Sequence, residues 1–228
     1  MKLLDSFTKK ILNYIFNNKS FAFDILEERE YRKLDGILKS VGLTKEEFLQ
    51  RSSFDKKEKI NVILCLLKEG YSAYHLFKFI NWKDFELLVK TLFEKHSFFV
   101  EQNFRFQNAG KTNEIDVLAF EFPYLFLLDC KFHKYDSPSS LKNAALKQKE
   151  RALNFIEAFP FIADHLIKKL SLPPQRVIYV FPAIISWYQI EPKSAENVPI
   201  VPFRLLKGFI DEIDEIRENL FYLKLKVL

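Results

Sequence analysis

The stretch from Glu114 to Lys131, with the sequence EIDVLAFEFPYLFLLDCK, most strongly limits what this chain can fold into. It predicts two apolar strands, over residues 114–121 and 124–132, joined by a tight turn at Pro123, where a missing N–H does no harm. Three charged residues nevertheless interrupt the apolar runs: Asp116, Asp129 and Lys131. A charge in a buried strand is unfavourable unless it is paired or bound to a metal. These residues therefore indicate a site within the sheet.

Strand alternation sets which of these side chains share a face. Asp129 and Lys131 are two residues apart and share one face, whereas Cys130 between them points the other way. If the strands pair as a hairpin, Asp116 lies near Asp129. Two carboxylates and a few waters form a typical Mg²⁺ site, because this hard ion prefers oxygen ligands. A lysine beside such an ion can activate the attacking water and offset charge on a phosphate.

The pattern of Asp116 followed by Asp129-Cys130-Lys131 resembles the D…(D/E)-x-K signature of the PD-(D/E)XK nuclease superfamily. Ile115 stands where the family name has proline. The sequence of the two strands is most similar to that of the family branch that contains Mrr-like proteins and archaeal Holliday junction resolvases. The resemblance extends from Trp82 to the C-terminus. It implies an α/β fold with a restriction-endonuclease-like core, in which helices flank a central mixed sheet.

The resemblance also implies two further site residues. The family usually adds an acid on a helix before the first strand, and Glu86 supplies one at that place. Some branches carry a glutamine on the helix after the site strands, and Gln148 matches it. Ala152 occupies the position at which the fuller motif has a tyrosine, which weakens the assignment of Gln148.

The activity that follows is hydrolysis of phosphodiester bonds in DNA by a metal-dependent endonuclease, in preference to an exonuclease. Asp116 and Asp129 would bind one or two Mg²⁺ or Mn²⁺ ions, with the backbone carbonyl of Cys130 as a further candidate ligand. Glu86 would assist through a second metal or a bridging water, and Lys131 would activate the attacking water. Nucleases of this type often act as homodimers because a duplex has two strands, so the resemblance implies a homodimer.

The periodicity elsewhere predicts two regions. Residues 1–80 are expected to be all-helical and to serve substrate recognition or oligomerisation. Residues 81–228 are expected to form the nuclease-like domain, with the order α-β-β-β-α-β in its core. The helices are predicted over residues 1–18, 24–40, from 44 onward, 55–69, 72–80, 82–96, 140–158, 161–170 and 203–219. Further strands are predicted over residues 97–106, 176–186, 200–202 and 221–227.

Several polar positions near the predicted site leave alternatives open. Residues 107–113 are expected to form a polar loop in which Lys111 or Asn113 either touches a phosphate or is merely solvated. Glu114 shares a face with Asp116 by strand parity and is either a further ligand or a rim residue. The turn around Gly70 separates two predicted helices, and an ordinary helical hairpin is preferred there over a DNA-binding helix-turn-helix.

The charge of the chain is compatible with nucleic acid and does not prove that it binds. The 228 residues carry a net charge of +5 at a pI of about 9.0. Residues 1–80 hold 15 Lys and Arg against 11 Asp and Glu, and residues 81–228 hold 20 against 19. No apolar run is long enough to span a membrane, and no signal-peptide core is evident. A cytoplasmic protein with reduced thiols at Cys65 and Cys130 is expected.

Two interpretations compete with the active nuclease. A DNA-binding or assembly module with a decayed site would keep the fold and lose the chemistry. Alternatively, the acids and Lys131 form a buried salt-bridge network in an unrelated α/β protein. The first predicts DNA binding without turnover, and the second predicts no specific binding of divalent ions.

Overall fold

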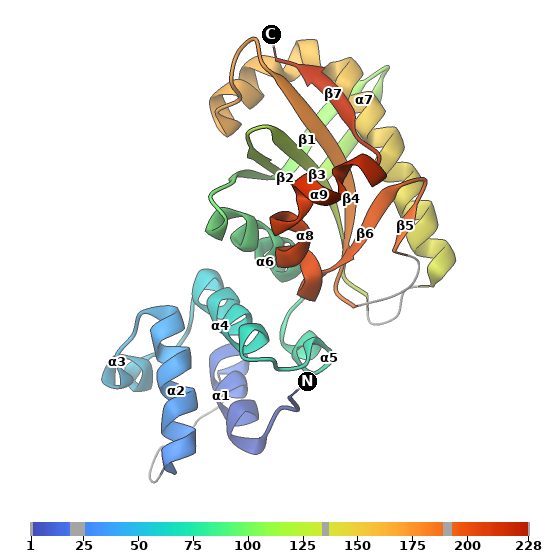
Figure 1. Cartoon of the computed structure of the whole chain (residues 1–228). Helices are drawn as coiled ribbons and strands as arrows, with labels where there is room; N and C mark the ends of the chain where they lie inside the picture. The colour runs from blue at the N-terminus through green and yellow to red at the C-terminus, as the bar shows by residue number, and fades with distance from the viewer. Residues whose placement is uncertain (1, 19–25, 134–136, 189–192, 228) are drawn as a thin grey trace. The chain divides into compact units, whose positions relative to one another are not determined.

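The computed structural model describes residues 2–18, 26–133, 137–188 and 193–227. The chain divides into two compact units, Met1–Asp84 and Phe85–Leu228. The sequence-based boundary was placed between residues 80 and 81, a few residues earlier. Figure 1 shows helices in the first unit and a sheet flanked by helices in the second.

The first unit is built from helices, several of which begin at residues whose side chains cap them. Its helices are α1 (Ser6–Asn17), α2 (Glu28–Val41), α3 (Lys45–Gln50), α4 (Lys56–Lys68) and α5 (Ala73–Leu76), followed by a 3₁₀ turn over Phe77–Phe79. Thr44 and Asp55 each form a capping box with the glutamate three residues on, which satisfies backbone donors at the starts of α3 and α4. In place of the helix predicted over residues 72–80, the structure has the short helix α5 followed by the 3₁₀ turn.

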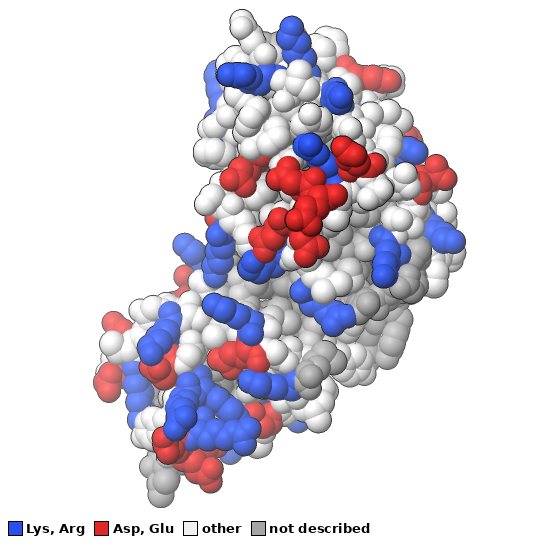
Figure 2. All heavy atoms as spheres, viewed as in Figure 1, with Lys and Arg blue, Asp and Glu red and all other residues white. Residues whose placement is uncertain are grey.

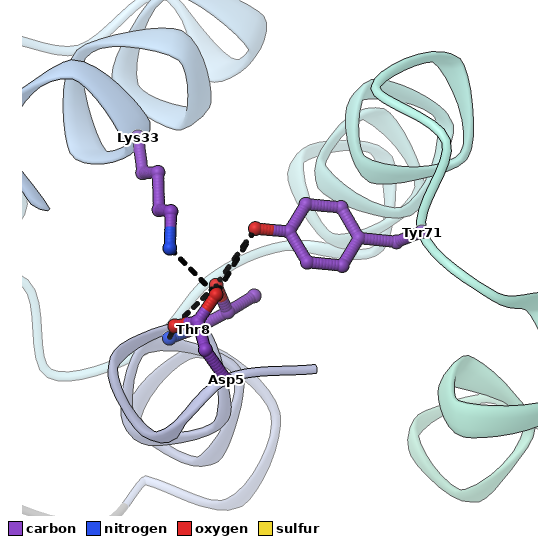
Figure 3. A network of polar contacts seen from close by, with 4 residues as sticks. All are labelled: Asp5, Thr8, Lys33 and Tyr71. Carbon is purple, nitrogen blue, oxygen red and sulfur yellow. Dashed lines mark hydrogen bonds and ion pairs between the residues drawn. The ribbon is translucent and has the colours of Figure 1, made fainter. Parts of the chain in front are cut away.

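A polar network joins three segments of this unit (Figure 3). Asp5 caps α1 by accepting a hydrogen bond from the backbone amide of Thr8 at 2.9 Å. Its Oδ2 lies 2.6 Å from Nζ of Lys33 on α2 and accepts a hydrogen bond from the hydroxyl of Tyr71 at 3.3 Å. Partial burial raises the pKa of Asp5, but Lys33 and the Thr8 amide outweigh it and lower the pKa to about 2. The ionised carboxylate is therefore the form that holds these segments together.

The second unit contains a mixed seven-stranded sheet. Its strands are β1 (Phe99–Asn108), β2 (Lys111–Glu121), β3 (Tyr124–Lys131), β4 (Val177–Ser186), β5 (Ser194–Ala195), β6 (Val198–Pro202) and β7 (Leu223–Lys226). The order is β1-β2-β3-β4-β6-β5, and β7 pairs with the first half of β4. The pairs β1–β2 and β2–β3 are antiparallel, whereas β3–β4 and β4–β6 are parallel.

Helices cover both faces of this sheet, which gives three layers (Figure 1). The long helix α7 (Pro138–Leu170) lies on one face, where Phe155, Phe159 and Leu166 share a core with apolar residues of β1 to β4 and β7. On the opposite face Phe126 of β3 contacts Phe93 of α6 (Trp82–Lys95) and Phe209 of α8 (Leu206–Asp211). Each face of β3 is thus buried, which explains its continuous apolar sequence.

Three sequence-based expectations are wrong in detail. The helices predicted over residues 140–158 and 161–170 are one helix, because Pro160 is exposed while the buried face of α7 continues past it. The loop predicted over residues 107–113 is a tight hairpin, in which Ala109 and Gly110 adopt positive φ angles of 48° and 78° between β1 and β2. The closing helix predicted over residues 203–219 is broken into α8, α9 (Ile213–Ile216) and two 3₁₀ turns.

A search of the described helices finds none whose length and apolar character would suit it to cross a membrane.

The Asp5 network predicts a local response to acid. The folded pKa of about 2 lies below the usual aspartate pKa of 3.8, so the stabilisation is present above pH 4 and is lost as the pH falls toward 2. Asp5→Asn should remove this dependence and increase amide exchange in α1 at neutral pH. Hydrogen exchange of α1 peptides measures both effects. Asp35→Asn, which removes an exposed pair with Lys39, is the matched control and should change neither.

Candidate active site

The two strand acids come together where β2 and β3 pair. Val117 is opposite Leu128, so the same antiparallel register places Asp116 beside Asp129. The alternation of β2 is interrupted at this point, because Ile115 and Leu118 both lie in the core beneath α7 although they are three residues apart. This irregularity turns the Asp116 carboxylate toward β3, where its Oδ2 accepts a hydrogen bond from the Cys130 amide at 2.6 Å.

Asp129 lies between two cations. Its side chain is almost fully buried, and Nη1 of Arg151 on α7 donates to Oδ1 at 2.7 Å. Nζ of Lys131 lies 2.6 Å from Oδ2. This second contact is an ion pair without hydrogen-bond geometry, since Oδ2 accepts no hydrogen bond from the described residues. Oδ2 is thus a buried carboxylate oxygen beside a cation, and a divalent ion bound there would share it with Lys131.

Asp116 is held in an environment that disfavours its ionised form. Burial raises its pKa, the charge of Asp129 raises it further, and the net result is a pKa of about 6. The Cys130 amide, Lys131 and Arg151 lower the pKa but only partly offset the first two causes. A neighbouring divalent cation would favour the ionised form of both acids.

Glu86 lies on the other side of the sheet from Asp129. It is buried on α6, the helix that packs against the face to which Phe126 and Cys130 point. Its charge adds to those of Asp116 and Asp129 in raising the pKa of the Cys130 thiol, after burial, which is the largest cause. Glu86 is therefore close to Cys130.

Gln148 contacts Arg151 and the backbone of β3. It is fully buried, its Nε2 donates to the backbone carbonyl of Leu127 at 2.8 Å, and its Oε1 accepts from Arg151 at 2.8 Å. It thereby anchors α7 to β3 and aims Arg151 at Asp129. From the sequence, Arg151 is expected with Lys142, Lys147 and Lys149 on a helix face that either contacts a phosphate backbone or is solvated, and its contact with Asp129 was not predicted. Its spacing of three residues from Gln148, on the same helix face, was the available signal.

The hairpin residues that were considered as phosphate contacts have other partners. Nζ of Lys111 lies 2.8 Å from Oε1 of Glu150. Asn113 is buried and accepts a hydrogen bond from Asn154 on α7. Glu114 is exposed and forms an ion pair with Arg105 at 3.0 Å.

An open pocket of about 590 Å³ lies over Asp129 and Lys131. Its lining is mostly polar and includes Arg151, Lys147 and Asn143 of α7, together with serines at the start of that helix. Within the described part of the chain no three His, Cys, Asp or Glu side chains are grouped to hold a metal. The donors that fit a hard cation here are the two carboxylates, with waters and a backbone carbonyl completing the shell.

Comparisons with known proteins add little to this geometry. No protein family model and no curated protein matches the sequence. Among solved structures, the chain is similar to the crystal structure of a protein of unknown function, AF1548. The sequence identity is 17%, the match covers 66% of this chain and 80% of the other, and the TM-score is 0.29. A likeness at this level carries no argument about fold or function.

The environment of Asp116 predicts that its charge costs stability. The folded pKa of about 6 exceeds the usual aspartate pKa of 3.8, so the protonated form stabilises the fold below pH 4, and this stabilisation is lost as the pH rises through 6. At pH 7.5, Asp116→Asn should therefore raise the free energy of unfolding by about 1–2 kcal/mol. Asp129→Asn should lower it by about 1–3 kcal/mol, because Lys131 and Arg151 lose their partner.

Chemical denaturation followed by tryptophan fluorescence measures this difference. The chain has two tryptophans, and Trp187 is buried in the second unit, so a Trp82→Phe background reports on that unit alone. Glu150→Gln, which changes an exposed carboxylate on α7, is the control. Destabilisation by Asp116→Asn at pH 7.5 would show that Asp116 belongs to a stabilising ion-pair network.

Proposed function

We propose that this protein is a metal-dependent nuclease that hydrolyses phosphodiester bonds in DNA. The observation that carries the proposal is the pairing of Asp116 and Asp129 on neighbouring strands, with Lys131 beside Asp129 at the floor of a polar pocket. Buried like charges are unfavourable, and functional sites are where such arrangements concentrate. The resemblance of these residues to the PD-(D/E)XK signature supports the same reaction.

The order of elements is a second support. From α6 the chain runs α6-β1-β2-β3-α7-β4. This is the order expected of the core of a restriction-endonuclease-like fold. Asp129 lies near the C-terminal end of β3, and Asp116 lies beside it in the middle of β2. The support is independent of the acids themselves, because it rests on the apolar patterns that set the strands and helices.

The proposed roles of the residues follow from their positions. A bound Mg²⁺ or Mn²⁺ would stabilise the charge that develops on the phosphate oxygens. Asp116 and Asp129 would hold it through carboxylate oxygens, including Oδ2 of Asp129. Lys131 would orient and activate the attacking water in the pocket. Arg151, which Gln148 positions, balances the charge of Asp129 and faces the same pocket.

DNA cutting and the response to divalent ions distinguish the nuclease from the two competing interpretations, the decayed module and the structural ion-pair network. A decayed module would bind DNA and never cut it. A structural network would show neither cutting nor a specific response to divalent ions, and it draws support from the pairing of both Asp129 oxygens with cations.

Cleavage of a labelled panel tests the proposal directly. The panel holds single strand, duplex, flap, four-way junction and plasmid DNA, each with Mg²⁺, Mn²⁺ or EDTA. We expect divalent-dependent cutting that falls at least about a hundredfold in Asp129→Asn and in Lys131→Met, because each removes a group at the reacting phosphate. Glu150→Gln should cut like the wild type.

The fold of each variant is checked by the denaturation experiment above. Full divalent-dependent cutting by both site variants would overturn the assignment of the residues. Absence of cutting on every substrate by a well-folded wild type that still binds DNA would favour the decayed module.

A further inference from the structure

One face of α7 carries a row of polar residues that runs away from the two acids. Arg151, Lys147, Asn143 and Ser139 are four residues apart, so they lie one above another along the helix. All of them line the pocket that contains Asp129 and Lys131. We call these residues of α7 the α7 row. Gln148 and Ala152, which flank the row, are buried, so the row lies along the edge between the core side of the helix and the pocket.

The row consists of hydrogen-bond donors and cations. Lys147 and Asn143 are exposed, and the row ends in the first turn of α7, where Ser137 caps the helix. Helix amides at such an N-terminus favour anions. Lys149, two residues after Lys147, does not line the pocket. It forms an ion pair with Glu196 and lies over the ring of Phe221. The basic and neutral donors of the row therefore suit a run of phosphates.

Acidic side chains gather elsewhere on the second unit. Exposed carboxylates cluster over α8 and α9 (Figure 2), from Asp211, Glu212, Asp214, Glu215 and Glu218. These helices cover the face of the sheet opposite α7. Residues 81–228 are nearly neutral in total, but their charges are unevenly distributed. The acidic face over α8 and α9 repels phosphates, whereas the α7 side offers hydrogen-bond donors and cations.

We propose that the α7 row is a track for the sugar-phosphate backbone of the substrate strand and leads it to the two acids. The row from Ser139 to Arg151 extends about 18 Å at 1.5 Å per residue. That length corresponds to roughly five nucleotides at 3.4 Å of helix axis each. Its side chains contact phosphates and read no bases, so binding through the row is independent of sequence. This inference rests on the proposed function, because the scissile phosphate lies at the end of the track.

Salt-dependent binding in EDTA tests the track without requiring catalysis. The probes are single-stranded oligonucleotides of two, five and ten nucleotides, with inorganic phosphate as a competitor. We expect affinity to rise steeply from two to five nucleotides. Lys147→Gln should weaken binding several-fold on every sequence and reduce the slope of log K against log salt by about 0.7 to 0.9.

Asn143→Asp is a second variant, because it places a negative charge at an exposed position of the row and leaves the core untouched. It should also weaken binding several-fold. Lys168→Gln is the matched control: it removes an exposed lysine from the same helix, 21 residues from Lys147 and about 32 Å along the axis. It should leave both affinity and slope unchanged.

The outcomes separate this inference from the nuclease proposal. No binding by the wild type, or wild-type affinity and slope in both row variants, would overturn the track even if the enzyme cuts DNA. Displacement of the decamer by inorganic phosphate at the oligonucleotide's own affinity would overturn it in favour of a single anion site. A reduced slope in Lys147→Gln without any cutting by the wild type would support the track and reject the nuclease.

Discussion

The proximity of two carboxylates inside a buried sheet is the constraint on which the rest of the second unit depends. Asp116 and Asp129 repel each other in surroundings that screen charge poorly, and the pKa of Asp116 is raised accordingly. Lys131 and Arg151 form ion pairs with Asp129, and the Cys130 amide donates a hydrogen bond to Asp116. These partners balance the acids only in part, and a divalent cation is the partner that would complete the balance.

Helix α7 joins this electrostatic problem to the packing of the domain. One side of it carries the apolar residues that bury the sheet face, and Gln148 ties it to β3 through the Leu127 carbonyl. Another side presents Arg151 to Asp129 and the α7 row to the pocket. The same helix thus supplies the apolar core residues and Arg151. Its buried Gln148 accepts a hydrogen bond from Arg151 and so helps to hold the guanidinium at Asp129.

The sequence predicted the parts of this arrangement that depend on local pattern. Apolar runs indicated β2, β3 and β4, and the spacing of Asp116, Asp129 and Lys131 suggested their meeting. Other features depend on tertiary contacts that no local pattern encodes. The buried face of α7 carries the helix past Pro160, and the break in the alternation of β2 is visible only in its packing. Glu86 was assigned from the family resemblance and the acids downstream, and the structure places it near Cys130, the residue between Asp129 and Lys131.

A titration with Mn²⁺, followed by its electron paramagnetic resonance signal in the absence of DNA, tests the paired-acid site most directly. The account predicts saturable binding by the wild type and by Glu150→Gln, and its loss in Asp116→Asn and Asp129→Asn. Ionised Asp116 is required, so the apparent affinity should fall up to about tenfold per pH unit below a pH of about 6. No specific binding by the wild type at pH 7.5, or binding that both variants retain, would contradict the claim that these two acids form a metal site.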